Sequence, residues 1–361
     1  MKISLYKYAA VILLSLPMIL SAHDEKLKGK YTKEKTVKKE FSVNADALLK
    51  ISNSYGNLNI SSWNQNRVLI EVHIKTNGNN EEKVQRKLDE ITIAFESSNS
   101  MVYAKTVFHK SKFNWGWGGN TNVNMQVNYT IKLPVKNSVN LTNDYGSIFL
   151  DRIDGHAKIN CDYGRLEIGE LRGRNNQLSF DYTSKSSIGY INSGNIKADY
   201  SGFTIEKAGD LIIRADYTNS TIEKIKNLQY TTDYGTIEIG EVHNIQGNGD
   251  YITLKLGTVH GNLDINSSFG SIRIDTMAED AGNLRIGSDY TDVKIGYDPG
   301  YYFDFEIRTS YARLRGKNEF EINISTEKSN NNYYKGYYGK ANSGNHIAIN
   351  SDYGGISFTK N

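Results

Sequence analysis

The chain of 361 residues has little cysteine and little proline, with one Cys and three Pro. A single cysteine excludes a disulfide framework and any zinc site built on several cysteines. Lys and Arg number 43 against 40 Asp and Glu, and this near balance gives no sign of a nucleic-acid partner. Glycine, at 32 residues, is far below the one third found in collagen-like chains.

Long apolar runs are also missing, apart from one near the start. Residues 1–22 begin with Lys2 and Lys7, continue through the apolar run Ala9–Leu16 and end in Leu-Ser-Ala. A basic start, a short apolar run and small final residues predict a secretory signal peptide. No later run of 18 apolar residues exists, so we predict a mature chain without a transmembrane segment. We expect an exported protein, located in the periplasm, on the outer cell surface or outside the cell.

Tyrosine is abundant, with 25 residues, and much of it belongs to an internal repeat. Asp-Tyr-Gly-like tripeptides recur at intervals of 17–21 residues, followed by one interval of 42. An outlying copy at Ser54-Tyr55-Gly56 precedes the others. We call the aromatic residues of the repeat the aromatic ladder, and they are Tyr145, Tyr163, Tyr182, Tyr200, Tyr217, Tyr234, Tyr251, Phe269, Tyr290, Tyr311 and Tyr353.

Small or apolar residues alternate around each ladder position, as strands require. Before Tyr163 they fall at Ala157, Ile159 and Cys161, and the phase changes after the aromatic residue, which predicts a corner at the following Gly. A repeat of about 18 residues made of short strands leaves no room for a helix. We predict an all-β fold, a single-stranded parallel β-helix over residues 144–361. Its handedness is not fixed by spacing, but right-handed winding is favoured because the six-residue apolar period of left-handed β-helices is absent.

The other segments are less regular. The lysine-rich residues 23–40 are expected to form a flexible basic tail. Residues 41–143 read as a strand-rich N-terminal cap region with one short helix at Asn80–Asp89, which has an Asn cap and early acidic residues. Residues 330–345, rich in Gly, Asn and Tyr, are predicted to be a loop inserted before the last coil.

Three motifs together resemble a known family. They are SYGNLNI at Ser54–Ile60, VNYTIKLPV at Val127–Val135 and the Asp-Tyr-Gly coils that follow. The chain resembles, over roughly residues 40–361, the bacterial putative adhesin family of exported β-helix proteins, which is related to auto-transporter adhesin head domains of the GIN type. The resemblance implies an exported, largely β-helical and non-enzymatic protein of the bacterial envelope, and it supplies no catalytic residues.

The ladder residues share the phase of inward Leu and Ile, so we expect their rings to point inward or to close the corner as part of the core. A glycan-binding aromatic stripe would need the outward phase. The preceding Asp column, from Asp144 to Asp352, faces outward and is expected to cap turns, while a calcium-binding column stays open as the alternative. Cys161 occupies a small inward position and is expected to be an inert core thiol.

Three sets of residues are candidates for ligand binding. A basic column at equivalent outward positions could match an anionic glycan, or could be an ordinary solvated face. Two Trp in a Gly-rich segment and four Tyr in the 330–345 segment could be exposed binding tips or plugs over an end of the β-helix. The column is Lys255, Arg273, Lys294 and Arg315, and the aromatic candidates are Trp115, Trp117, Tyr333, Tyr334, Tyr337 and Tyr338.

No catalytic arrangement emerges from the sequence. The acidic residues follow the repeat instead of gathering in one coil, and no Ser-His-Asp grouping or phosphate-binding loop is found. We therefore expect no enzyme, no cofactor and no metal site. The expected function is an adhesin-like binding or interaction scaffold of the envelope with a glycan or protein partner. The alternatives are a purely structural envelope protein or a polysaccharide-degrading β-helix enzyme.

Overall fold

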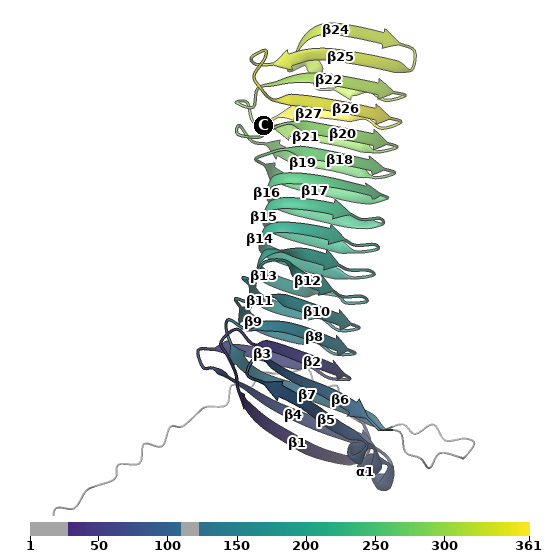
Figure 1. The fold of residues 1–361 in the computed structure, drawn as a ribbon. Helices are drawn as coiled ribbons and strands as arrows, with labels where there is room; N and C mark the ends of the chain where they lie inside the picture. The colour runs from purple at the N-terminus through teal and green to yellow at the C-terminus, as the bar shows by residue number, and fades with distance from the viewer. Residues whose placement is uncertain (1–27, 110–122) are drawn as a thin grey trace, which may run out of the picture.

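The structure is a computed structural model that describes residues 28–109 and 123–361. It is all-β, with one sheet of 27 strands that winds through a tall stack (Figure 1). This confirms the predicted all-β class. The sheet is mixed, because parallel pairs form the middle of the stack and antiparallel pairs form both ends. The predicted signal peptide at residues 1–22 lies outside the described residues.

The stack is built from coils, each with a ladder residue at one corner. One side holds the strands that precede the ladder residues, and the opposite side holds those that follow; β13 to β16 run round a corner and contribute to both. The preceding strands are β2 (Leu48–Ser54), β8 (Ser138–Asp144), β10 (Ala157–Asp162), β12 (Asn176–Ser179), β18 (Leu263–Ser268), β20 (Leu284–Asp289), β22 (Phe303–Ser310) and β26 (His346–Asp352). The following strands are β3 (Leu58–Trp63), β9 (Ile148–Ile153), β11 (Leu166–Leu171), β17 (Ile252–Val259), β19 (Ser271–Met277), β21 (Asp292–Tyr297), β23 (Leu314–Arg315) and β27 (Ile356–Lys360). The four long strands are β13 (Ser186–Lys197), β14 (Gly202–Arg214), β15 (Asn219–Thr231) and β16 (Gly235–Asp250).

Alternation along each strand fills the core. In β10, Ala157, Ile159 and Cys161 are fully buried, while the residues between them face outward. Ile159 pairs with Leu141 in the coil on one side and with Leu178 in the coil on the other, so equivalent apolar residues stack along the axis. This continuous burial is the main stabilising term of the stack.

The corner after a ladder residue leaves no room for a side chain in several coils. A Cβ built on Gly164 would lie 2.0 Å from the carbonyl oxygen of Gly146 in the neighbouring coil. Glycine at this position therefore lets two backbones approach closely.

The repeat begins at residue 48, earlier than the predicted boundary at 144. Strands β2 and β3 pair in parallel with β8 and β9, so Tyr55 joins the ladder as its first ring. The chain then leaves the stack and returns at residue 138. The excursion and the N-terminal strand consist of β1 (Tyr31–Ser42), β4 (Arg67–Gly78), α1 (Glu81–Asp89), β5 (Ile91–Ser98), β6 (Met101–Phe108) and β7 (Asn124–Pro134).

These elements lie beneath the first coil (Figure 1). Strand β4 pairs antiparallel with both β1 and β7. The helix α1 confirms the prediction at Asn80–Asp89, with the Asn80 side chain accepting a hydrogen bond from the Lys83 N–H. The predicted flexible tail at 23–40 is wrong from Tyr31 onward, because β1 pairs over its whole length with β4.

The C-terminal end is not in sequence order. Strands β26 and β27, the last in the chain, lie between the coil of β20 and β21 and the coil of β22 and β23. The predicted loop at 330–345 is wrong in its first half. Strand β25 (Asn331–Tyr338) pairs antiparallel with β22 and with β24 (Glu321–Lys328), which follows the short 3-10 helix η1 (Lys317–Glu319). The resulting hairpin covers the end of the stack (Figure 1).

Candidate functional site

Every ladder residue adopts the left-handed backbone conformation. Their φ angles range from 46° at Tyr290 to 64° at Tyr55, and Phe269 has a φ of 57°. This region costs an L-residue roughly 1–2 kcal/mol. The backbone of the corner is nevertheless satisfied, because every ladder N–H except that of Tyr311 donates to the carbonyl of an Asp or Ser in the next coil, at 2.8–3.1 Å. The Tyr311 N–H, at the end of the ladder, donates to the Asn330 carbonyl at 2.7 Å.

The twelve rings, counting Tyr55, form one continuous stack. Neighbouring ring centroids lie 4.6–5.3 Å apart and the planes differ by 2–9°. Parallel contacts of this kind contribute roughly 0.5–1.5 kcal/mol each. The stacking therefore offsets much of the backbone cost at each corner.

The ladder lies on the surface, and the prediction of inward rings is wrong. Exposed fractions run from 41% at Tyr55 to 58% at Tyr311. The physical reason is the left-handed φ, which turns the side chain out of the alternation of the preceding strand. Among the tyrosines, the buried rings are others, such as Tyr129 and Tyr230.

The Asp column runs beside the ladder and caps the corners. The Asp162 carboxylate accepts a hydrogen bond from the N–H of Asp181 at 3.1 Å, and the same bond repeats at 2.9–3.1 Å through Asp199, Asp216, Asp233 and Asp250. These bonds match the predicted turn-capping role, although each crosses to the next coil. Within the described residues, no group of three or more His, Cys, Asp or Glu is placed to hold a metal ion.

Burial raises the pKa of some groups in and beside the ladder. Burial and then the nearby Asp162 carboxylate raise the pKa of Asp144, against a lowering hydrogen bond from Ser54. Burial, followed by the neighbouring rings Tyr182 and Tyr145, raises the pKa of Tyr163. The Tyr163 phenol thus stays neutral at physiological pH. Burial raises the pKa of the Cys161 thiol to about 12, in agreement with an inert core position.

The basic column is interrupted and partly paired. Lys255, Arg273 and Lys294 are register neighbours, but Ser357 of β27 lies between Lys294 and Arg315. The Lys255 ammonium lies 3.7 Å from a Glu238 carboxylate oxygen, and the Arg273 guanidinium lies 2.7 Å from that of Asp275. The four side chains are exposed on one side of the stack, as expected.

The four tyrosines of β25 belong to the end hairpin and not to a loop. Tyr334 and Tyr338 are buried, with the Lys317 ammonium 4.4 Å from the Tyr334 ring centroid. Tyr333 and Tyr337 are half-buried. The structure therefore favours the plug interpretation for Tyr334 and Tyr338. Trp115 and Trp117 lie outside the described residues.

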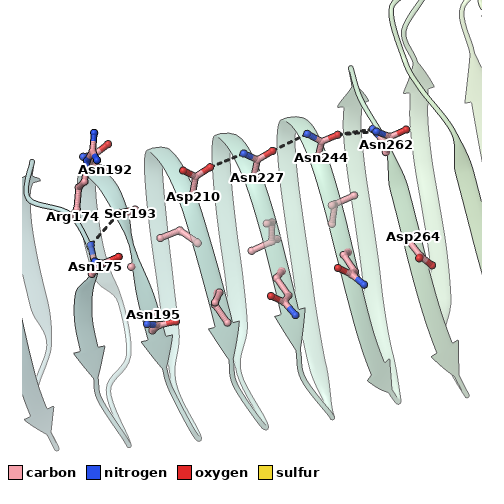
Figure 2. Close-up of a pocket in the computed structure, with 17 residues that line it drawn as sticks. Arg174, Asn175, Asn192, Ser193, Asn195, Asp210, Asn227, Asn244, Asn262 and Asp264 are labelled. Atoms are coloured by element: carbon pink, nitrogen blue, oxygen red, sulfur yellow. Dashed lines mark hydrogen bonds between the residues drawn. The ribbon is translucent and has the colours of Figure 1, made fainter.

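A polar groove crosses six coils on the side that precedes the ladder (Figure 2). Its volume is about 1020 Å³. One edge is a line of amides in which Asn227 donates to Asp210 at 2.6 Å, Asn244 donates to Asn227 at 2.8 Å, and the Asn262 N–H donates to Asn244 at 2.8 Å. The full lining is Arg174, Asn175, Asn192, Ser193, Gly194, Asn195, Asp210, Leu211, Ile212, Asn227, Leu228, Gln229, Asn244, Ile245, Gln246, Asn262 and Asp264.

The sequence contained a signal for this groove that the predictions missed. Asp210, Asn227, Asn244 and Asn262 each lie seven residues before a ladder residue. An Asn or Asp repeated at one outward position predicts a hydrogen-bonded column as clearly as the Asp column does. The hollow itself depends on the shape of the coil and could not be derived from spacing.

Comparisons with known proteins give distant similarities only. No protein-family model matches the chain, and no curated protein matches it. A putative adhesin from Parabacteroides merdae is 8% identical, with a TM-score of 0.35 over 90% of this chain and 96% of that one. A putative adhesin and a putative lipid binding protein, both from Parabacteroides distasonis, are 9% and 11% identical. Their TM-scores are 0.32 and 0.33, covering 92% and 90% of this chain and 98% and 96% of theirs. These TM-scores are too low to transfer a fold or a function to this chain.

Proposed function

We propose that this protein is an exported, non-enzymatic, adhesin-like scaffold that binds an envelope glycan or protein along its aromatic ladder. The observation that carries the proposal is the exposure of twelve stacked rings in one line from Tyr55 to Tyr311. Large contiguous apolar surfaces that stay exposed on a folded protein mark interaction sites. The predicted signal peptide at residues 1–22 supports export.

The stacking limits what the ladder can offer a partner. Interior rings have neighbours on both faces, so a sugar ring cannot stack on them. They present ring edges and phenol hydroxyls, beside the partly exposed carboxylates of the Asp column. The partner that fits this edge carries hydrogen-bonding groups repeated along a line, as an extended polymer does.

The pairing of the coils supports a scaffold. The parallel register of consecutive coils supports a single-stranded parallel β-helix, for which we favour right-handed winding. No helix of the described residues is long and apolar enough to cross a membrane. A rigid rod of stacked coils holds its recognition edge in fixed geometry, which limits the conformational entropy lost on binding.

The carboxylates support a non-enzymatic role. Those from Asp162 to Asp233 each accept a backbone hydrogen bond and are spread along the axis. A glycosidase needs two carboxylates facing one bond. The anionic-glycan hypothesis rests on the basic column, of which Lys294 and Arg315 have no carboxylate within 4.0 Å among the described residues.

The test is retention of polysaccharide and protein fractions from bacterial envelope extracts on the immobilised full chain. The variant replaces Tyr200, Tyr217 and Tyr234 by Asn, which tolerates left-handed φ. A second variant replaces the same three by Phe, which keeps the stack, as Phe269 does naturally, and removes only the phenol hydroxyls that the ladder presents to its partner. We expect at least a tenfold loss of retention for the Asn variant.

Each other outcome has a definite meaning. Equal retention by the Asn variant and the native chain contradicts the ladder as the binding edge. No retention of any fraction by the native chain supports the purely structural alternative. Depolymerisation of a retained polysaccharide would establish the enzyme alternative.

A further inference from the structure

The amide-lined groove is a separate surface from the ladder. It runs from the coil of Tyr182 to the coil of Phe269, and its edge is the line from Asp210 to Asn262 (Figure 2). Successive coils are about 4.8 Å apart, so the groove follows the stack axis for about 24 Å. A ligand that fills it must be elongated and must repeat its contacts along its length.

The amides leave hydrogen-bonding groups for such a ligand. The Asn227 side chain uses one N–H to Asp210 and its oxygen accepts from Asn244. An amide has two N–H donors and two acceptor lone pairs, so one donor and one lone pair remain on Asn227. Asn244 keeps one free donor, because its oxygen accepts from both the backbone N–H and the side-chain amide of Asn262. Gln229 and Gln246 are exposed in the floor of the groove on neighbouring coils. Together with Asn227 and Asn244, the Gln229 and Gln246 side chains give the groove both donors and acceptors on two neighbouring coils.

The charge of the lining argues for an uncharged ligand. Asp210 and Asp264 carry negative charge and Arg174 carries positive charge, and the other polar lining side chains are neutral. A polyanion would meet two carboxylates and one guanidinium. Hydroxyl groups, which donate and accept at once, match neutral amides without any such repulsion.

The backbone argues against an extended peptide. The strands of the groove floor are paired on both edges, with β15 held between β14 and β16. No sheet edge is open there for strand addition, which is the main way that extended peptides gain affinity on β-proteins. The buried side chains of Leu211 and Leu228 also offer no deep apolar pocket.

We propose that this groove binds a neutral, extended polysaccharide that lies parallel to the stack axis, with about one sugar unit in contact with each coil. The groove residues lie five to eight positions before the ladder residues in the chain, as Asn244 and Gln246 do before Tyr251, so this site does not depend on the ladder being a binding edge. Affinity should rise with oligosaccharide length until the chain spans the groove, at about five or six sugar units.

The probes are glucomannan as the neutral polysaccharide, polygalacturonate as the anionic one and reduced, carboxymethylated albumin as the extended polypeptide. The variant is Gln229→Ala with Gln246→Ala. The control is Thr221→Ala with Glu238→Ala, which changes outward residues of the same strands β15 and β16 on another side of the stack. Circular dichroism and thermal unfolding of both variants show whether they remain folded.

Isothermal titration with the full chain should show binding of glucomannan that changes little between low and high salt. The Gln variant should bind at least tenfold more weakly, and the control should bind as the native chain does. The proposal is overturned if glucomannan does not bind, if both variants bind it equally, or if the Gln variant instead loses binding of polygalacturonate or of the polypeptide. If the ladder is found to bind no partner while glucomannan still binds, the proposed ladder function is wrong and the groove remains a binding site.

Discussion

The ring of Tyr353 stacks on the ring of Tyr290, with 4.6 Å between centroids and 2° between planes. The last coil of the chain therefore lies inside the stack, and the coil of Tyr311 lies beyond it. The coil of β26 and β27 packs between two neighbouring coils, so its apolar residues Ile347, Ile349 and Ile356 are almost completely buried.

This order predicts a specific cross-link. Lys294 and Ser357 are register partners on neighbouring coils. The variant Lys294→Cys with Ser357→Cys should form a disulfide on mild oxidation, because adjacent coils bring Cα atoms within disulfide range. The buried Cys161 should not interfere. The matched pair, Lys294→Cys with Arg315→Cys, is two coils apart and should stay reduced.

Non-reducing mass mapping distinguishes the two arrangements. If the 294–315 pair oxidises readily and the 294–357 pair does not, the coils follow sequence order and the observed threading is wrong.

The left-handed corner makes a prediction about Tyr217, whose φ is 52°. Tyr217→Phe should leave the denaturation midpoint almost unchanged, since ring stacking survives. Tyr217→Asn should lose about 1–3 kcal/mol from two stacking contacts. Tyr217→Val should lose roughly 1–2 kcal/mol more, because a β-branched residue resists left-handed φ. Equal stability of the Asn and Val variants would show that the corner is not strained.

Asp181 predicts an unusual pH effect. Burial raises the pKa of this carboxyl, the hydrogen bond from the Asp199 N–H lowers it, and the Asp162 and Asp199 carboxylates raise it, with a net upward shift. A folded pKa above the unfolded one means that the folded state binds more protons. The contribution of Asp181 to stability is therefore full below the unfolded pKa and is lost as pH rises through the folded pKa.

Asp181→Asn keeps an acceptor oxygen for the Asp199 N–H and removes the charge. We expect a gain of roughly 0.5–1 kcal/mol at pH 7 that disappears near pH 3. Thermal unfolding at several pH values measures it. Asp181→Ala, which removes the acceptor, should show no gain; an Asn variant less stable than the native chain at pH 7 contradicts the argument.

The basic column predicts unequal contributions to polyanion binding. Lys255 and Arg273 are already paired with Glu238 and Asp275, so their charges are partly neutralised. The variant Lys294→Gln with Arg315→Gln should therefore weaken heparin binding in low salt more than Lys255→Gln with Arg273→Gln does. If the fourfold Gln variant binds heparin as the native chain does, the column has no role in recognising anions.

Much of the fold follows from the sequence. The period-two apolar pattern predicted the strands of the stack, and the Asn80 cap predicted α1. The spacing could not show where the last coil lies. The interval of 42 residues between Tyr311 and Tyr353 is the same whether the coil of Tyr353 packs above or below the coil of Tyr311. Similarly, the outlying motif at Tyr55 was placed in the predicted cap region, because no local signal shows that the chain forms a coil there, leaves the stack after Trp63 and returns at Ser138.

The candidate site was predicted less well, for a local reason. Counting by twos placed Tyr163 in phase with Ile159 and Cys161, but a left-handed residue breaks that count and sends its ring outward. The change of phase after each Tyr was visible in the sequence. It was read as a corner at the following Gly, whereas the ladder residue itself makes the turn.

The central claim is that the ladder lies on the surface and binds a partner there. Tyrosine nitration with tetranitromethane, mapped by mass spectrometry with and without bound envelope material, tests both parts. We expect the ladder tyrosines to react in the free protein, the buried Tyr129 and Tyr230 to stay unmodified, and the ladder to become protected when the partner binds. Ladder tyrosines that stay unmodified in the free protein, or that react equally in the complex, would contradict the account.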